Sequence, residues 1–346
     1  MLFKTATLSQ LAEFDEIIDV RSPAEFADDH IPGAINCPVL DDAERVLVGT
    51  LYSQQSPFEA RKVGAALVAK NIARHLETQF SGYPKAWRPL IYCWRGGQRS
   101  GAMSIILNQI GWAAHKLEGG YKAYRRHVLQ QLEVLPAAFS FHVLCGPTGS
   151  GKSRFLQALR NTGHQVLDLE ALAQHRGSVL GQLPEAPQPT QKWFETSLLH
   201  TLAQMNPARP IYVESESRKI GRLSVPASLL QAMHNGHCLS MATHESVRVK
   251  ALLEDYPHFT GNKGLLEKQL EFLQPFHARE TLEAWRKLIA VGDFPALVAS
   301  LLEQHYDPAY FRALGKNYAD LAQAERLVLP DLSAATLMVQ ASALPR

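Results

Sequence analysis

The chain has 346 residues, of which 46% are hydrophobic and 20% are charged. This composition excludes a disordered or fibrous protein, and the length suits two domains with cores of their own. The formal net charge of +2 at pH 7 is too small to indicate a nucleic-acid-binding protein by itself.

The apolar runs are too short to cross a membrane. Typical long ones, Phe141–Cys145 and Ile211–Val213, are strand-sized, whereas a membrane helix needs about 20 apolar residues. The first residues, Met1 to Thr5, lead into polar sequence without the apolar core of a signal peptide. We therefore expect a cytoplasmic protein with no membrane contact.

Alternating short apolar runs and helical periods organise the first part of the chain. The expected elements are strands at Glu16–Val20 and Pro89–Cys93 and helices at Pro23–Asp28, Pro57–Thr78 and Ser100–Ile110. This alternation predicts an α/β domain with a parallel sheet covered by helices, over residues 1–132.

A second α/β pattern follows a break at 133–138. Strands are expected at Phe139–Cys145, Gln165–Leu169, Pro210–Val213 and His237–Met241, with a helix at Arg154–Arg160. We assign this domain to residues 133–260. Residues 261–346 are expected to form a mainly helical region packed on it, because apolar positions such as Leu266, Leu270 and Leu273 recur at helical spacing.

The four cysteines are far apart in the sequence, at Cys37, Cys93, Cys145 and Cys238. None shows C-x-x-C spacing, so the sequence predicts neither a disulfide framework nor a metal site.

Cys93 ends a buried-type strand and is followed by a glycine-rich loop, Trp94-Arg95-Gly96-Gly97-Gln98-Arg99, before the next helix. Adjacent glycines let the backbone curl so that N–H groups point inward, and the helix N-terminus adds positive potential. Arg95 and Arg99 add positive charge. The loop is therefore predicted to hold an anion and to present Cys93 as a nucleophile.

The same loop has the C-x5-R spacing of cysteine-dependent phosphatases, in which the arginine clamps phosphate oxygens. Tyr92 stands where many such enzymes have histidine, and no aspartic acid is evident as the proton donor.

Three segments resemble rhodanese domains in order along the chain. The segment Ile17–Phe26 with His30–Asn36 resembles their entry signature, the Cys93 loop their active-site loop, and Leu117–Tyr121 their closing signature. Within the first of these, Asp19 and Arg21 are expected to brace the loop by buried hydrogen bonds rather than to act in catalysis.

Gly146-Pro147-Thr148-Gly149-Ser150-Gly151-Lys152-Ser153 fits the phosphate-loop pattern G-x-x-x-x-G-K-[ST]. A strand precedes it and a helix follows it, which is the context that this motif requires. Its backbone amides are predicted to surround phosphate oxygens, Lys152 to neutralise charge, and Ser153 to reach Mg²⁺ where that ion is bound. Asp168 and Glu214 are two candidate acidic partners, which the sequence does not rank.

The order of a rhodanese-like domain followed by a phosphate loop is similar to the tRNA 2-selenouridine synthase family. Further segments that look like this family are Asp168–Glu170 with His175–Ser178, Gln188–Gln191, Val213–Gly221 and His305–Pro308. The resemblance implies a fold of the α/β class. In it, an N-terminal rhodanese-like parallel-sheet domain precedes a P-loop NTPase-like α/β domain with a helical C-terminal region.

The resemblance also implies an activity, in which sulfur of 2-thiouridine at the tRNA wobble position is replaced by selenium through a geranylated intermediate. The implied co-substrates are selenophosphate and geranyl diphosphate, and no tightly bound cofactor is expected. Cys93 would receive selenium as a perselenide or otherwise assist its delivery, and the phosphate loop would hold the prenyl diphosphate or another phosphate group. The implied partners are tRNA and an enzyme that produces selenophosphate.

A tRNA substrate would give the short basic clusters a purpose, because phosphate contacts supply affinity that does not depend on sequence. Arg125, Arg126, Arg218 and Lys219 are the candidate contacts. Three other functions stay open: a sulfurtransferase with an attached ATP-dependent kinase or hydrolase, a C-x5-R cysteine phosphatase, and a rhodanese-like binding module on a nucleotide-regulated switch.

Overall fold

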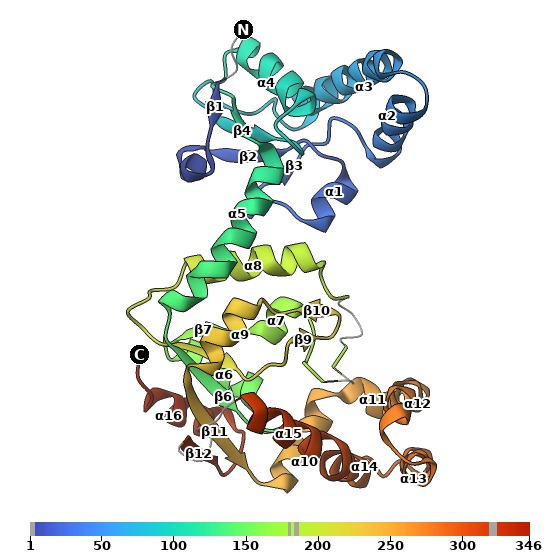
Figure 1. Cartoon of the computed structure of the whole chain (residues 1–346), viewed down its shortest axis with the longest axis vertical. Coiled ribbons are helices and arrows are strands. Elements are labelled where there is room, and N and C mark those ends of the chain that lie inside the picture. The colour runs from blue at the N-terminus through green and yellow to red at the C-terminus, as the bar shows by residue number, and fades with distance from the viewer. Residues whose placement is uncertain (1–3, 179–180, 183–186, 318–323) are drawn as a thin grey trace. The chain divides into compact units, whose positions relative to one another are not determined.

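The structure is a computed structural model that describes residues 4–178, 181–182, 187–317 and 324–346 (Figure 1). Its contacts divide the chain into two compact units. Unit 1 holds residues 1–131 and 190–200, and unit 2 holds residues 132–189 and 201–346. The assignment of domains to residues 1–132, 133–260 and 261–346 stays a prediction.

Unit 1 contains, among its described residues, a five-stranded sheet in which all neighbours are parallel. In spatial order the strands are β1 (Thr5–Ala6), β5 (His115–Leu117), β4 (Pro89–Tyr92), β2 (Glu16–Asp19) and β3 (Ile35–Asn36). Strand β4 is buried at all four positions, as its continuous apolar run predicts for a central parallel strand.

Unit 1 has seven helices among its described residues, and three of them contribute side chains to the core beside the sheet. The seven helices are η1 (Leu8–Glu13), α1 (Pro23–Asp28), α2 (Asp42–Gln54), α3 (Pro57–Thr78), α4 (Gln98–Ile110), α5 (Gly120–Val134) and α8 (Gln191–Ala203), the last two extending into unit 2. Ser56 caps the start of α3 by accepting a hydrogen bond from Phe58 N, and Pro57 suits its first turn. Helix α3 has the predicted bounds.

Unit 2 contains a second five-stranded parallel sheet among its described residues. Its spatial order is β12 (Glu325–Leu329), β11 (His237–Thr243), β6 (Phe141–Cys145), β8 (Ile211–Glu214) and β7 (Gln165–Leu167). A short antiparallel pair is formed by β9 (Lys219–Ile220) and β10 (Leu223–Ser224). The edge strand β12 was not predicted, because it follows a long helical segment.

The helices of unit 2 form two groups. Around the sheet lie η2 (Leu135–Ala138), α6 (Lys152–Asn161), α7 (Leu169–Ala173), α9 (Ala227–His234), α10 (Glu245–Asp255) and α16 (Ala334–Ser342). The others are α11 (Pro257–Gly261), α12 (Lys263–Leu270), η3 (Glu271–Phe276), α13 (Arg279–Val291), α14 (Phe294–Leu301), η4 (Leu302–Tyr306) and α15 (Asp307–Asn317). Several of this second group share a core around Trp285. No helix among the described residues is both long and apolar enough to span a membrane.

One expectation about the cysteines is wrong. The structure joins Cys145 and Cys238 in a disulfide. The two residues lie on neighbouring parallel strands, β6 and β11, and their Cα atoms are 6.2 Å apart, within the range that a disulfide spans. Their sequence separation of 93 residues gives no sign of this pairing.

Candidate functional site

Cys93 lies directly after β4, where the central strand of unit 1 ends at the loop. The residue is buried, with 3% of its surface exposed. Gly97 N donates a hydrogen bond to Cys93 Sγ over 3.2 Å, and Ser100 Oγ lies 3.2 Å from the same sulfur. Because α4 begins at Gln98, the sulfur sits at the N-terminal end of a helix, where backbone N–H groups and the helix dipole favour negative charge.

A glycine turn fixes the backbone of this loop. Tyr121 N donates to Cys93 O and Lys122 N donates to Trp94 O, both over 2.9 Å. Gly120, with φ of +57°, makes this approach possible, because a Cβ there would meet Cys93 O and would lie 2.5 Å from Gly96 N. The closing segment of the sequence therefore holds the Cys93 loop in shape.

The side chain of Arg99 forms an ion pair with Glu25. Its guanidinium donates to the carboxylate of Glu25 on α1, with distances of 2.6 and 3.3 Å. Burial alone would raise the pKa of Glu25, but the hydrogen bonds and charge of Arg99, together with Ser22 N and Arg45, lower it overall. The arginine of the C-x5-R pattern is therefore paired with Glu25, whereas Arg95 is exposed.

Asp19 and Arg21 form a buried brace beside the loop. The guanidinium of Arg21 donates to both carboxylate oxygens of Asp19 and, over 2.6 Å, to Asp29 O. It also lies 3.9 Å from the centre of the Tyr121 ring. These contacts agree with the structural role expected for the pair.

The phosphate loop of unit 2 joins β6 to α6, as the motif requires. Gly149 and Gly151 have φ of +78° and +90°, values that favour glycine. The ammonium of Lys152 donates to Gly146 O over 2.6 Å, so the lysine lies along the loop itself. Burial lowers the pKa of Lys152, against nearby carboxylates that raise it.

Three glutamates surround Lys152. Glu214 ends β8 and is 2% exposed, and its Oε1 accepts a hydrogen bond from Glu170 N over 2.7 Å. Ser153 Oγ donates to Glu170 Oε2 over 3.0 Å. Glu216 also acts electrostatically on Lys152. Burial is the main cause of a raised pKa for all three acids, and the pKa of Glu216 rises to about 8.

The two acids that the sequence left unranked have different surroundings. Asp168 accepts a hydrogen bond from Ala171 N over 2.9 Å and caps α7, a common structural role. Glu214 belongs to the group around Lys152 and has a buried oxygen, Oε2, without a hydrogen-bond partner among the described residues. Glu170 and Glu216 were not among the acidic partners predicted from the sequence. Each lies two residues after one of the predicted acids, Asp168 or Glu214, beyond the carboxyl end of a strand, where ligands of α/β sheets bind.

A cavity of about 350 Å³ opens around the phosphate loop. Besides loop residues from Thr148 to Ser153, its lining includes Glu170, Arg176, Glu216, Tyr256, Tyr306 and Tyr310. Lys152 and Arg176 bring positive charge, and the loop brings backbone amides, so the cavity suits a phosphate or diphosphate group. No group of three or more His, Cys, Asp or Glu side chains in the described parts of the chain is arranged to hold a metal ion.

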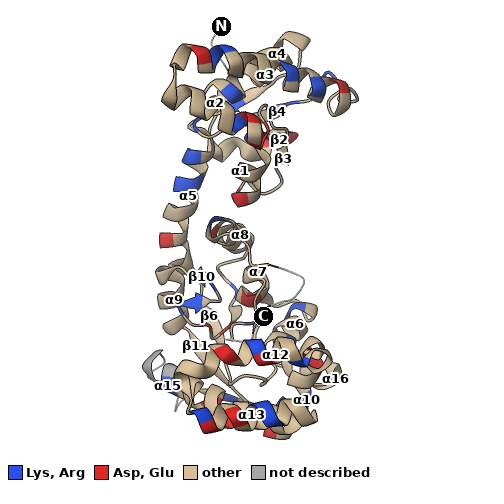
Figure 2. Ribbon diagram, turned by 90° about the vertical axis from the view of Figure 1, so that its right-hand side faces the viewer, with Lys and Arg blue, Asp and Glu red and all other residues tan. Residues whose placement is uncertain are grey.

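The basic clusters differ in exposure. Figure 2 shows basic positions along α5, where Arg125 is 16% exposed and forms an ion pair with Glu195. Its guanidinium also donates to Lys192 O over 3.3 Å. Arg126, Arg218 and Lys219 are exposed. These three side chains are accessible to a phosphate backbone, whereas Arg125 is already engaged.

Comparisons with known proteins match both units. A family model for the tRNA 2-selenouridine synthase AAA domain matches residues 139–289, and one for the rhodanese-like domain matches residues 5–127. The tRNA 2-selenouridine synthase of Nitrosomonas europaea is 38% identical over 69% of this chain. That of Bdellovibrio bacteriovorus is also 38% identical over 69% of this chain.

These alignments cover 63% and 64% of the two relatives, so the chain spans just under two thirds of their length. The tRNA 2-selenouridine synthase of Sulfurovum sp. is 31% identical, and the alignment covers 87% of this chain and 89% of that protein.

Proposed function

The chain belongs to the tRNA 2-selenouridine synthase family, and on this basis we propose that it replaces sulfur by selenium in 2-thiouridine at the wobble position of tRNA. The observation that carries the proposal is the hydrogen bond from Gly97 N to Cys93 Sγ at the N-terminus of α4, in a chain that also has a phosphate-loop cavity. Cys93 supplies a nucleophile in an anion-binding loop. The phosphate-loop cavity supplies a site for a phosphorylated substrate.

In the proposed first step, the sulfur of 2-thiouridine attacks carbon 1 of geranyl diphosphate. A carbon–sulfur bond forms, the carbon–oxygen bond to diphosphate breaks, and the base loses its N3 proton to solvent. The phosphate loop and Lys152 hold the diphosphate as it leaves, because they concentrate N–H donors and positive charge where negative charge develops. Glu216, whose pKa burial raises to about 8, shares a hydrogen bond with Glu170 beside the loop.

In the second step, selenium displaces the alkylated sulfur. We assign Cys93 the attack on the phosphorus of selenophosphate, which forms a sulfur–phosphorus bond, breaks the phosphorus–selenium bond and releases hydrogen selenide anion. That anion attacks C2 of the geranylated base, geranylthiol leaves with a proton, and water hydrolyses the phosphocysteine to phosphate. A perselenide on Cys93 with release of phosphate would instead require an oxidant, which this reaction does not supply.

The test follows the nucleoside by mass spectrometry after incubation with 2-thiouridine tRNA, geranyl diphosphate and selenophosphate. Wild type should give the geranylated and then the selenated base. Cys93→Ala should geranylate but not selenate, and Lys152→Ala should lose geranylation. Cys37→Ala is the matched control, because Cys37 is the other free cysteine and its buried thiol donates a hydrogen bond to Gln79 Oε1.

Two results would overturn the proposal. One is selenation by Cys93→Ala at the wild-type rate, and the other is ATP turnover that depends on Lys152 without any geranyl transfer. A phosphoryl group found on Cys93 after selenophosphate alone, and absent from Cys37, would support the assigned step.

The exposed residues Arg126, Arg218 and Lys219 are the proposed tRNA contacts, and the cytoplasm is the proposed compartment. Replacing any of the three by alanine should weaken tRNA binding. It should also reduce the slope of log affinity against log salt concentration by roughly the contribution of one phosphate contact. An unchanged salt dependence in all three variants would remove them from the interface.

A further inference from the structure

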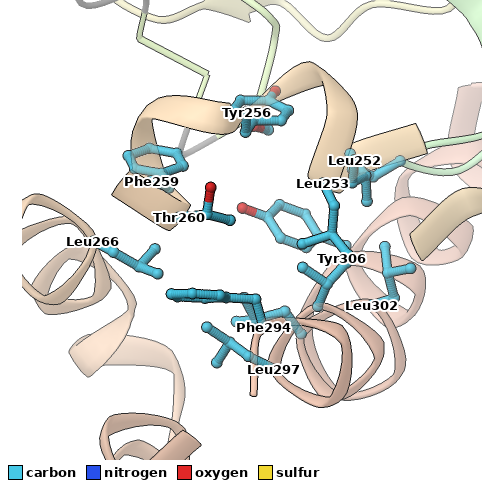
Figure 3. A pocket seen from close by; sticks show the side chains of 14 residues that line it. Leu252, Leu253, Tyr256, Phe259, Thr260, Leu266, Phe294, Leu297, Leu302 and Tyr306 are labelled. Carbon is cyan, nitrogen blue, oxygen red and sulfur yellow. The ribbon is translucent and has the colours of Figure 1, made fainter. Parts of the chain in front are cut away.

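A second cavity, of about 70 Å³, lies among the C-terminal helices of unit 2 (Figure 3). Side chains from α10, α11, α12, α14 and η4 line it, among them Leu253, Phe259, Leu266, Phe294, Leu297 and Leu302. None of the described residues in its lining is charged. The hydroxyl of Thr260 donates to Pro257 O over 2.9 Å, on its own helix, and so has a partner.

This apolar cavity adjoins the phosphate cavity. Five residues line both: Thr148, Ser178, Leu252, Tyr256 and Tyr306. Thr148 belongs to the phosphate loop. Leu252 packs against the same loop, because a Cβ on Gly149 would lie 3.0 Å from Leu252 Cδ1. A ligand could therefore place a charged group in one cavity and an apolar chain in the other.

The chemistry of the two cavities defines the class of ligand. The phosphate side has backbone amides, Lys152 and Arg176, whereas the apolar side has mainly hydrocarbon and aromatic surface. At roughly 10–15 Å³ for each water-sized group, the apolar cavity has room for about five to seven such groups. This is half or more of a ten-carbon chain, and the remaining carbons fit at the shared wall beside Leu252 and Tyr306.

We infer that this cavity binds the isoprenoid chain of the diphosphate donor and sets the chain length that the protein accepts. The inference rests on the proposed function for the identity of the donor. Figure 3 shows Phe294 and Leu297 across the cavity from Tyr256 and Thr260. Since Tyr256 also faces the phosphate cavity, Phe294 and Leu297 lie at the far end of the chain site. Phe294 and Val298 then limit its length and width.

The test measures dissociation constants by calorimetry for dimethylallyl, geranyl and farnesyl diphosphate, which carry chains of increasing length. Phe294→Ala should shift the ratio of farnesyl to geranyl affinity towards farnesyl by roughly tenfold or more, because it lengthens the cavity. Val298→Phe should shift the ratio of geranyl to dimethylallyl affinity towards dimethylallyl by a similar factor, because it fills the cavity.

Each variant has a matched control on the surface of the same helical region. Phe272→Ala and Val291→Phe repeat the two substitutions at residues that are 62% and 78% exposed and do not line the cavity. Both controls should leave the ratios unchanged. All four variants should bind inorganic diphosphate as wild type does, which shows that the fold and the phosphate loop are intact.

Unchanged affinity ratios in both Phe294→Ala and Val298→Phe, with normal diphosphate binding, would overturn the inference. A loss of diphosphate binding in either variant would also count against it, because the chain site would then not be separable from the phosphate site. The binding ratios do not depend on turnover. Absence of geranyl transfer to tRNA in wild type would therefore refute the proposed function without deciding the chain site.

Discussion

Replacing Gly120 by alanine should destabilise unit 1 and stop selenium transfer. Gly120 has φ of +57°, a conformation that costs an alanine about 1–2 kcal/mol. The added Cβ would meet Cys93 O and would lie 2.5 Å from Gly96 N. Real Cβ contacts stay above 3.0 Å, so the turn and the loop must separate by roughly 0.5 Å or more.

That separation weakens the two hydrogen bonds from Tyr121 N and Lys122 N to the Cys93 loop, each with a net contribution of about 1 kcal/mol. The total expected loss is therefore about 3–4 kcal/mol. Gly33→Ala is the matched control, because Gly33 has φ of +81° and a Cβ there would meet nothing within 4 Å. It should lose only the conformational cost of about 1–2 kcal/mol.

Urea titration followed by tryptophan fluorescence measures the difference, since four of the five tryptophans, all except Trp285, belong to unit 1. Gly120→Ala should unfold at a lower urea concentration than Gly33→Ala. It should also fail to selenate tRNA while it still transfers the geranyl group, because the phosphate loop is in unit 2. If Gly120→Ala matched Gly33→Ala in both stability and selenation, the reasoning about this turn would be refuted.

Three further predictions concern buried charges. Burial raises the pKa of Glu216 from 4.5 to about 8, so the folded chain keeps a proton that the unfolded chain releases between these values. The unfolding free energy of wild type should fall as pH rises through this window, and Glu216→Gln should show a smaller fall in Tm in a pH series. Burial raises the pKa of Glu25, but Arg99 with Ser22 N and Arg45 lowers it overall, so its contribution is present above the ordinary pKa of 4.5 and is lost as pH falls through the lowered pKa of the folded chain. Glu25→Gln should therefore lower Tm at pH 7, and this effect should shrink as the pH falls below 4.5. Arg248→Ala removes a buried partner of Asp307 and a hydrogen-bond donor to Thr148 O of the phosphate loop. It should lower the free energy of unfolding in urea titrations by roughly 3 kcal/mol and weaken the binding of inorganic diphosphate. A variant that binds diphosphate as tightly as wild type would contradict this prediction.

The sequence predicted the parts of the fold that local signals determine. Cys93 lies between a strand and a glycine-containing loop that leads into a helix, and Lys152 follows such a loop at the start of a helix, as their motifs indicate. Helix α3 was predicted from end to end because Ser56 and Pro57 give a clear start. Short parallel strands such as β1, β3 and β5 were missed, because two or three residues carry too little periodicity.

Features that depend on contacts between distant segments could not be read from the sequence. Glu170 and Glu216 act on Lys152 from segments that follow two different strands, β7 and β8, so their approach to Lys152 depends on the order of strands in the sheet. The disulfide between Cys145 and Cys238 depends on the pairing of β6 with β11, which was not predictable from their spacing. The apolar cavity depends on how several short helices pack, although the helical periodicity itself was visible.

We propose that the phosphate loop takes a prenyl diphosphate rather than ATP, because an apolar cavity adjoins it. The adjoining cavity offers leucine and phenylalanine side chains rather than charged groups that could read the edge of a base. Because the same loop residue, Thr148, lines both cavities, a donor with an apolar chain matches the site on both sides at once.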